Sequence, residues 1–137
     1  MVKRELVQAR LERLREYLQV LKFIKKRGLQ RFRDDPLVRG AAERYLHLSI
    51  ECVIDVGNHI ISDRRYRKPE TYAEIFEILF EKGVLPEKLF HELRGMAGFR
   101  NVLVHDYVRL DAEKVFGFIQ SKLKYIEELA AVYSELV

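Results

Sequence analysis

The chain has few of the residues that characterise secreted, metal-binding or membrane proteins. Its 137 residues include no Trp, 3 Pro and a single cysteine, Cys52, so no disulfide can form within the chain. One thiol cannot build a thiolate zinc site, and the sequence contains neither a His-Glu-x-x-His motif nor a glycine-rich phosphate loop. We therefore expect no metal and no cofactor, with Cys52 as a small buried hydrophobe in a reducing, cytoplasmic setting.

Long apolar runs are also missing. None approaches the roughly 20 residues that a membrane-spanning helix needs, and the N-terminal MVKRELVQAR lacks the apolar core of a signal peptide. The expectation is a soluble, unsecreted protein without a membrane partner. A chain of 137 residues can bury one core without disulfides, so residues 1–137 are expected to form a single domain.

Positive charge is concentrated at the beginning of the chain. Residues 1–33 carry 11 Lys or Arg against 3 acidic residues, whereas the remainder carries 14 against 18. A second basic cluster, RRYRK, occupies residues 64–68. Such a surface attracts a phosphate backbone or an acidic partner, and it is equally compatible with a merely solvated helix. Composition leaves these alternatives open.

Apolar residues recur at spacings of three and four along most of the chain, which is the period of a helix with one buried face. The predicted helices are approximately 3–27, 36–62, 72–82, 87–105 and 112–136. Asp35, Thr71 and Asp111 are expected as their N-caps. Gly95 and Gly98 weaken the fourth helix, where another helix or a ligand could approach closely. The predicted fold is an all-α antiparallel bundle of four main helices and one short helix.

The second predicted helix has an unusual polar side. Its members recur at helical spacing and form a continuous stripe. They are Arg44, His47, Glu51, Asp55 and Asn58. The stripe is either a solvated face with internal salt bridges or a polar wall that meets another helix.

The segment FRNVLVHDY, residues 99–107, places polar side chains among aliphatic ones at the end of a predicted helix. Arg100 and Tyr107 share one helix face, and Asn101 and His105 share the adjacent one. Arg100 and His105 are five residues apart, so on a regular helix their side chains point in directions about 140° apart around the axis. They converge only if the helix loosens near its end or if a second copy of the motif faces the first.

A permanently charged guanidinium and an imidazole that titrates near neutral pH are the minimum equipment for cleaving RNA without metal. The ribose 2′-OH would attack the phosphate, His105 would transfer protons, and Arg100 would stabilise the pentacoordinate phosphate. The product would end in a 2′,3′-cyclic phosphate. Spacing alone also fits a structural explanation, in which both side chains cap helix carbonyls and Tyr107 is a packed aromatic.

GFRNVLVHDY resembles the R-x4-H-x-Y signature of HEPN-domain proteins of the HepT type. The likeness covers most of the chain: AAERYLHLSIECVIDVGNHIIS is similar to the family's long second helix, residues 72–101 to its middle, and YVRLDAEKVFGFI to its closing helix. These proteins are the toxins of toxin–antitoxin pairs whose antitoxin is a minimal nucleotidyltransferase. The resemblance implies a HEPN bundle that forms a homodimer, with two motifs in one composite ribonuclease cleft.

Carried over residue by residue, the resemblance implies that Arg100 and His105 are the catalytic pair of a metal-independent endoribonuclease, with Asn101 as the polar residue after the arginine. Tyr107 matches the tyrosine that the cognate antitoxin adenylylates, which would block and repel RNA.

Helical spacing adds the hypothesis that Glu51 and Asp55 hold the Arg100 guanidinium. Two alternatives have no catalytic role for the motif. One is a helical subunit that binds a nucleotidyltransferase, and the other is a plain interaction protein.

Overall fold

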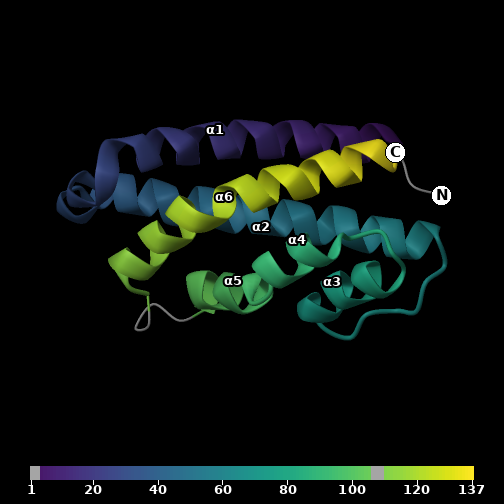
Figure 1. Cartoon of the computed structure of the whole chain (residues 1–137). Coiled ribbons are helices and arrows are strands. Elements are labelled where there is room, and N and C mark those ends of the chain that lie inside the picture. The colour runs from purple at the N-terminus through teal and green to yellow at the C-terminus, as the bar shows by residue number, and fades with distance from the viewer. Residues whose placement is uncertain (1–3, 106–109) are drawn as a thin grey trace.

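The computed structural model describes residues 4–105 and 110–137, and every regular element within them is a helix. The elements are α1 (Arg4–Asp34), α2 (Pro36–Asp63), α3 (Tyr72–Glu81), α4 (Glu87–Glu92), α5 (Met96–His105) and α6 (Ala112–Glu135). The predicted all-α bundle is confirmed. The long helices α1, α2 and α6 run side by side, and the shorter α3, α4 and α5 form a second layer beside them (Figure 1). Among these helices, none is both long and apolar enough to cross a membrane.

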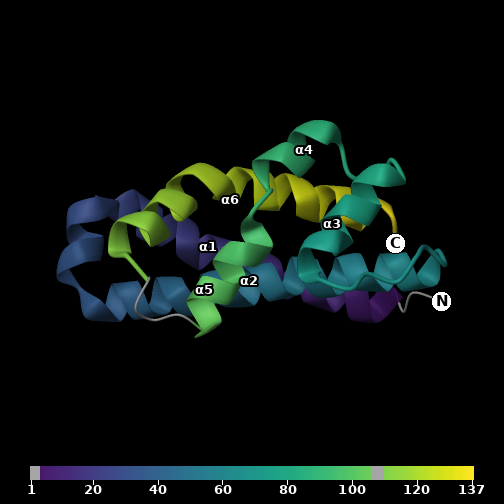
Figure 2. The same ribbon diagram turned by 90° about the horizontal axis from the view of Figure 1, so that it is seen from below.

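Helix α2 is the centre of the bundle, because it packs against α1, α3, α5 and α6. The view in Figure 2 shows α3 and α5 on the side of α2 that faces away from α1. A helix enclosed in this way buries residues around most of its circumference. Even Ser49 is fully buried, and its hydroxyl donates to the Tyr45 carbonyl at 2.7 Å. In the middle of α2, the exposed residues Arg44, Asp55 and Asn58 all belong to the polar stripe.

Helix α1 follows its predicted pattern up to Gly28. The predicted apolar stripe is buried throughout, and it consists of Val7, Leu11, Leu14, Leu18 and Leu21. Gly28 has φ 87° and ψ 167°, so the helix kinks where the sequence predicted its end. A further helical turn follows to Asp34 and buries Phe32 against Phe116 of α6, with ring centroids 5.3 Å apart. This aromatic contact holds together the turn that leads into α2.

The fourth predicted helix, 87–105, is divided into α4 and α5. Gly95 lies between them with φ 83°, a left-handed conformation that residues with a Cβ rarely adopt. The apolar residues on both sides of the break, Leu93 and Met96, are buried, so the periodicity runs through it. The change of direction allows α5 to lie against α2 while α4 contacts α6. The break therefore decides where Arg100 points.

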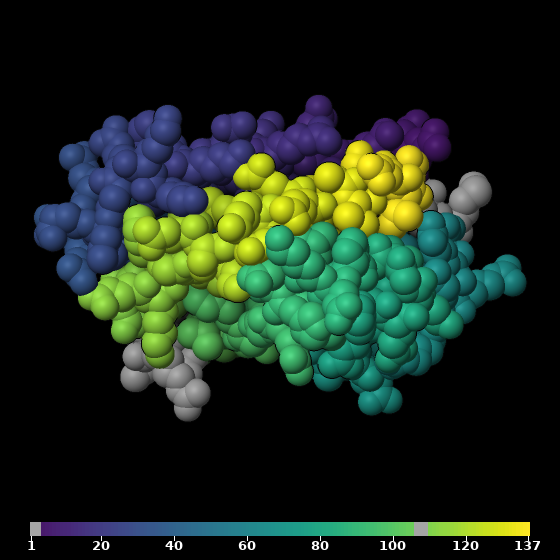
Figure 3. Space-filling view, in the orientation of Figure 1, coloured from purple at the N-terminus to yellow at the C-terminus, as the bar shows by residue number. Residues whose placement is uncertain are grey.

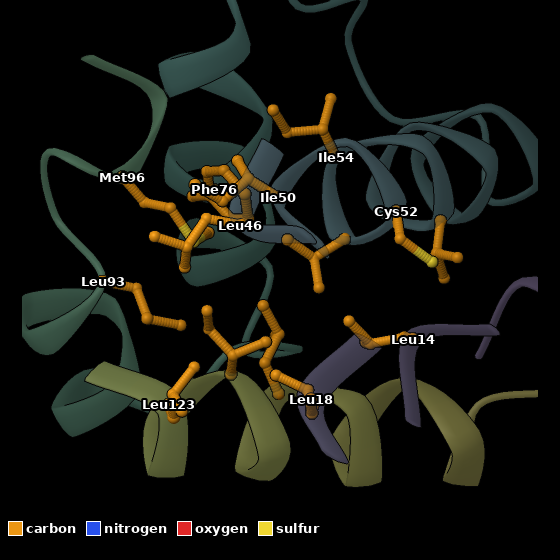
Figure 4. Packing of buried hydrophobic residues seen from close by; sticks show 14 of the residues in the cluster. Leu14, Leu18, Leu46, Ile50, Cys52, Ile54, Phe76, Leu93, Met96 and Leu123 are labelled. Atoms are coloured by element: carbon orange, nitrogen blue, oxygen red, sulfur yellow. The ribbon is translucent and has the colours of Figure 1, made fainter. Parts of the chain in front are cut away.

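The core fills the space between the two layers. Figure 4 shows Leu14 and Leu18 of α1 and Leu123 of α6 on one side, with Leu93 and Met96 across from them. Helix α6 covers the core along the face drawn in Figure 3, where it lies between α1 and the second layer.

Cys52 is buried, as the sequence predicted. Its Sγ donates to the Arg10 carbonyl at 2.9 Å. Burial, reinforced by the nearby Asp55 carboxylate, raises the pKa of this thiol to about 11. The side chain therefore stays protonated and acts as a packing group.

Gly57 is a point of close contact between α2 and its neighbours α3 and α6. The Tyr133 hydroxyl of α6 donates to the Val53 carbonyl at 3.0 Å, and burial raises the pKa of that phenol so that it stays a donor. A Cβ at Gly57 would lie 2.8 Å from Tyr133 Oη and 2.9 Å from Ile75 Cγ2 of α3. The missing side chain thus lets α3 and α6 both reach α2.

Replacing Gly57 by alanine should destabilise the protein, whereas Gly40→Ala should stabilise it. Both residues lie in α2, where alanine is the better helix former by about 1 kcal/mol. Gly40 has nothing within 4 Å of an added Cβ, so only this gain applies. At Gly57 the steric clash should outweigh the gain in helix propensity, so the free energy of unfolding should fall by about 1–3 kcal/mol. Urea unfolding at one fixed protein concentration measures both, and equal shifts of the two midpoints would contradict the packing argument.

Candidate active site

The polar stripe of α2 meets α5 at Arg100. Arg100 Nε donates to Glu51 Oε1 in a short, ion-paired hydrogen bond. The same carboxylate oxygen lies 3.4 Å from Nε2 of His47, and Nδ1 of His47 lies 3.5 Å from Nη1 of Arg44. The helical spacing of these α2 residues therefore builds a chain of polar groups that ends on the guanidinium of Arg100.

Two further contacts hold the Arg100 guanidinium. Its Nη1 donates to Asn101 Oδ1 at 3.1 Å, and its Cζ lies 5.0 Å from the ring centroid of Tyr72, in cation–π range. The Arg100 side chain is 14% exposed, although it carries a permanent charge. An arginine this shielded depends on its partners, which also fix the plane of the guanidinium.

Tyr72 was not predicted from the sequence. It is the first residue of α3, 28 positions before Arg100, and only the folded chain brings it onto the guanidinium. Tyr72 is 42% exposed, which distinguishes it from the core aromatics. The sequence offered one signal for Tyr72, which is its position directly after the Thr71 N-cap. A large aromatic residue at an exposed helix start is not needed for core packing, so it indicates another role.

Hydrogen bonds and an ion pair hold the N-terminus of α3, and with it Tyr72, in place. Thr71 Oγ1 accepts from the Glu74 N–H at 3.2 Å, as predicted, while Glu74 Oε2 accepts from the Glu70 N–H at 2.6 Å. Arg67 Nη1 lies 3.2 Å from Glu74 Oε1. The Glu70 hydrogen bond and then Arg67 lower the pKa of the Glu74 carboxyl, so it is ionised at neutral pH. These contacts fix the segment that presents Tyr72 to α5.

Asp55 does not share the role of Glu51. It lies one helical turn further along α2, and its Oδ2 pairs with Nη1 of Arg10 on α1 at 3.7 Å. The structure therefore gives Arg100 a carboxylate partner in Glu51, whereas the expected contact from Asp55 is replaced by one to α1. Asp55 instead lines an open pocket together with Asn101.

Arg100 and His105 are not brought together within one chain. His105 is the last residue of α5 and is exposed, while Arg100 is turned onto α2. Helix α5 remains helical through His105, which places the two side chains about 140° apart around its axis. No hydrogen bond or ion pair joins these two described residues. The predicted Tyr107 lies outside the described residues.

Metal ligands do not gather at this place. In residues 4–105 and 110–137, no group of three His, Cys, Asp or Glu side chains comes close enough together to hold a metal ion. The polar groups near Arg100 are bound to one another instead, as the chain from Arg44 to Arg100 shows.

The helical bundle has the fold of a HEPN toxin of known structure. More narrowly, residues 7–132 match the family described as Ribonuclease HepT-like. This match covers most of the chain, and the chain belongs to that family.

Curated relatives support the same assignment. The tRNA nuclease HepT of Aphanizomenon flos-aquae is 30% identical over 119 residues, which cover 87% of this chain and 81% of the relative. The mRNA nuclease HepT of Shewanella oneidensis is 28% identical over 101 residues, 74% of this chain and 76% of the relative. YutE of Bacillus subtilis is 35% identical over 81 residues, 59% of this chain, and the matched region spans only 56% of YutE.

Solved structures show the same fold. The tri-AMPylated HEPN toxin of Shewanella oneidensis, solved in complex with an MNT antitoxin, superposes with a TM-score of 0.85 at 23% identity, covering 96% of this chain and 97% of the toxin. The cytosolic protein YutE superposes with a TM-score of 0.87 at 24% identity, covering 98% and 90%. Nearly the whole chain thus follows one known architecture.

The Glu51–Arg100 pair should show strong energetic coupling in a double-mutant cycle. Both partners are largely shielded from water and joined by a charged hydrogen bond, so we expect about 1.5–3 kcal/mol of coupling between Glu51→Ala and Arg100→Ala. The control is the pair Glu87 and His91 on α4, which is exposed and should couple by less than about 0.5 kcal/mol. Urea unfolding provides all the free energies. Equal coupling in the two pairs would show that Arg100 is not held as described.

Proposed function

We propose that the chain is a metal-independent endoribonuclease toxin of a toxin–antitoxin pair whose antitoxin is a minimal nucleotidyltransferase. Arg100 and His105 are its catalytic residues. The observation that carries the proposal is the state of Arg100: a nearly buried guanidinium, fixed by Glu51, Asn101 and Tyr72, inside the R-x4-H segment of a HepT-like chain. The Arg100 guanidinium hydrogen-bonds the side chains of Glu51 and Asn101 rather than the carbonyls of a helix end, which are what a capping arginine would contact.

Arg100 acts as an electrostatic catalyst. Attack on an RNA phosphate places an additional negative charge on its non-bridging oxygens, and a charge that is already in position stabilises it without reorganisation. Glu51 and Asn101 provide that preorganisation by fixing Nε and Nη1 of the guanidinium. Glu51 is therefore a positioning residue, because it acts through Arg100.

His105 transfers the protons. As a base, it removes the proton of the ribose 2′-OH while the oxygen attacks the neighbouring phosphorus. The bond from phosphorus to the 5′-oxygen breaks, and that oxygen takes a proton from the imidazolium. The products are a 2′,3′-cyclic phosphate and a free 5′-hydroxyl, so the balance requires neither metal nor water.

A homodimer would bring Arg100 and His105 together, which a single chain does not do. Two routes could bring Arg100 and His105 together: a loosened helix end or a second copy of the motif. Helix α5 remains helical through His105, which disfavours the first route within the described residues. We propose that two copies face each other across α5, so that the exposed His105 of each copy serves a composite cleft with Arg100.

The partner and the substrate follow from the same proposal. Names of relatives include both an mRNA nuclease and a tRNA nuclease, so RNA is the substrate class proposed here. The nucleotidyltransferase antitoxin neutralises the toxin in the cytoplasm by adenylylating Tyr107. The added AMP brings bulk and a negative phosphate close to the cleft, and these exclude an RNA phosphate by contact and by charge.

Purified protein should cleave total RNA in the presence of EDTA. His105→Ala should lower the rate by roughly 10²- to 10⁴-fold, because it removes proton transfer. Arg100→Ala should lower it by roughly 10²- to 10³-fold, as expected for one lost stabiliser of the transition-state charge. The control is His91→Ala, which changes an exposed histidine on α4.

Gel assays and mapping of the product ends measure these rates. Equal cleavage by wild type and His105→Ala would remove the catalytic assignment. Growth arrest without any RNA cleavage would favour the alternative of a non-catalytic subunit that binds a nucleotidyltransferase.

Co-expression with a cognate minimal nucleotidyltransferase should add AMP to Tyr107. Intact-protein mass spectrometry and peptide mapping detect the modification, and the modified protein should lose its RNase activity. Tyr107→Phe should keep that activity and remain unmodified, so it should stay toxic when both proteins are present. An AMP group on another residue, with full inhibition of Tyr107→Phe, would contradict this regulatory assignment.

A further inference from the structure

An open pocket of about 660 Å³ lies directly beside Arg100. Its walls come from α2, from the segment that enters α3, and from α5. The polar and aromatic residues of the lining are Asp55, Asn58, Glu70, Thr71, Tyr72 and Asn101. Pockets of this size hold drug-sized ligands, so a nucleoside fits within it.

Two residues connect this pocket to the catalytic arginine. Asn101 accepts a hydrogen bond from Arg100, and the Tyr72 ring packs against the same guanidinium, yet both also line the pocket. A phosphate bound to Arg100 would therefore have its neighbouring nucleoside at the pocket mouth. The pocket and the proposed catalytic centre share a wall.

The lining suits a nucleobase better than a second phosphate. Asp55 and Glu70 are negatively charged, and they would repel phosphate oxygens while accepting N–H groups from a base edge. The ion pair of Asp55 with Arg10 is long, at 3.7 Å, so both carboxylate oxygens retain accepting capacity. Tyr72 contributes a partly exposed aromatic ring of the kind on which bases stack in RNA-binding proteins.

The hydrogen-bonding groups also favour particular bases. Asn101 uses its oxygen for Arg100, which leaves its amino group as a donor toward the pocket. Asp55 presents acceptors only, and Asn58 offers both kinds of group. A carboxylate that accepts two adjacent N–H groups matches guanine, whose edge presents N1–H beside the N2 amino group, and the Asn101 amino group can donate to guanine O6. Adenine, cytosine and uracil each place an acceptor beside their N–H donor, so the Asp55 carboxylate accepts fewer hydrogen bonds from them.

We infer that this pocket is the base-binding subsite of the ribonuclease. It takes the base that follows the scissile phosphate, stacks it against Tyr72, and selects guanine through Asp55, with Asn58 and Asn101 as further hydrogen-bonding groups. This inference rests on the proposed function, because it places the phosphate at Arg100. It assigns Asp55 to substrate selection rather than to orienting Arg100.

Cleavage of a randomised RNA pool in EDTA, with sequencing of the product ends, tests the subsite. Wild type should cleave immediately before guanine about tenfold more often than before the other three bases, since one good base contact discriminates by roughly 5- to 150-fold. Asp55→Asn should remove most of this preference while cleavage continues. Glu128→Gln, the same chemical change on the exposed side of α6, should leave the preference unchanged. Cleavage by wild type without base preference, or an unchanged preference in Asp55→Asn, would overturn the subsite and leave the proposed nuclease intact.

Tyr72 variants separate base stacking from support of Arg100. Tyr72→Phe keeps the aromatic ring and should retain most of the affinity that Tyr72→Ala loses. Tyr72→Ala should raise KM for a short RNA roughly tenfold, as expected for loss of one stacked base. A purely supporting role would instead lower kcat and leave KM unchanged, which would contradict the stacking assignment.

A binding experiment tests the pocket even if the protein cleaves nothing. The probes are the 2′-O-methyl dinucleotides UpA, UpC, UpG and UpU, which lack the attacking hydroxyl. In NMR titrations, the side-chain amides of Asn58 and Asn101 should shift with UpG and at least fivefold more weakly with the other three probes. Equal response to all four, or shifts confined to other surfaces, would exclude a base-selective pocket. Absence of cleavage together with selective binding would overturn the proposed function alone.

Discussion

The ion pair between Arg100 of α5 and Glu51 of α2 is the interaction on which the proposed site depends. A guanidinium with 14% exposure is largely withdrawn from water, and the Glu51 carboxylate is the charged group that compensates it. The pair also fixes how α5 lies on α2. Asn101 and Tyr72 contact the same guanidinium. Side chains from α2, α3 and α5 therefore meet at the charge of Arg100.

Helix α2 makes this arrangement possible because it serves both layers. It packs against four other helices, so its position in the bundle is determined by the core and not by the polar contacts. Gly57 brings α3 and α6 close to it, and α3 carries Tyr72 at its first position. The break at Gly95 turns α5 toward the polar stripe. Core packing thus determines the geometry of a site that is itself polar, which is how a small bundle holds a catalytic group rigidly.

Much of the fold was predictable from local patterns. The 3.6-residue period located the buried faces of α1, α2 and α6, and cap residues such as Asp35, Thr71 and Asp111 located the helix starts, because both signals are local in sequence. The division of 87–105 was missed, since the apolar pattern continues across Gly95 while the chain changes direction. The apolar periodicity indicates which residues are buried. It does not indicate whether these residues belong to one continuous helix or to two helices with different axes.

For the site, the sequence by itself determined the candidates: the R-x4-H spacing of Arg100 and His105, and the stripe that contains Glu51 and Asp55. Only the tertiary structure decided how they pair. It joined Glu51 to Arg100, sent Asp55 to Arg10, and brought Tyr72 onto the guanidinium from another helix. Helical spacing defines directions around a single axis, whereas contacts between helices depend on how their axes are packed, and that packing is a property of the whole core.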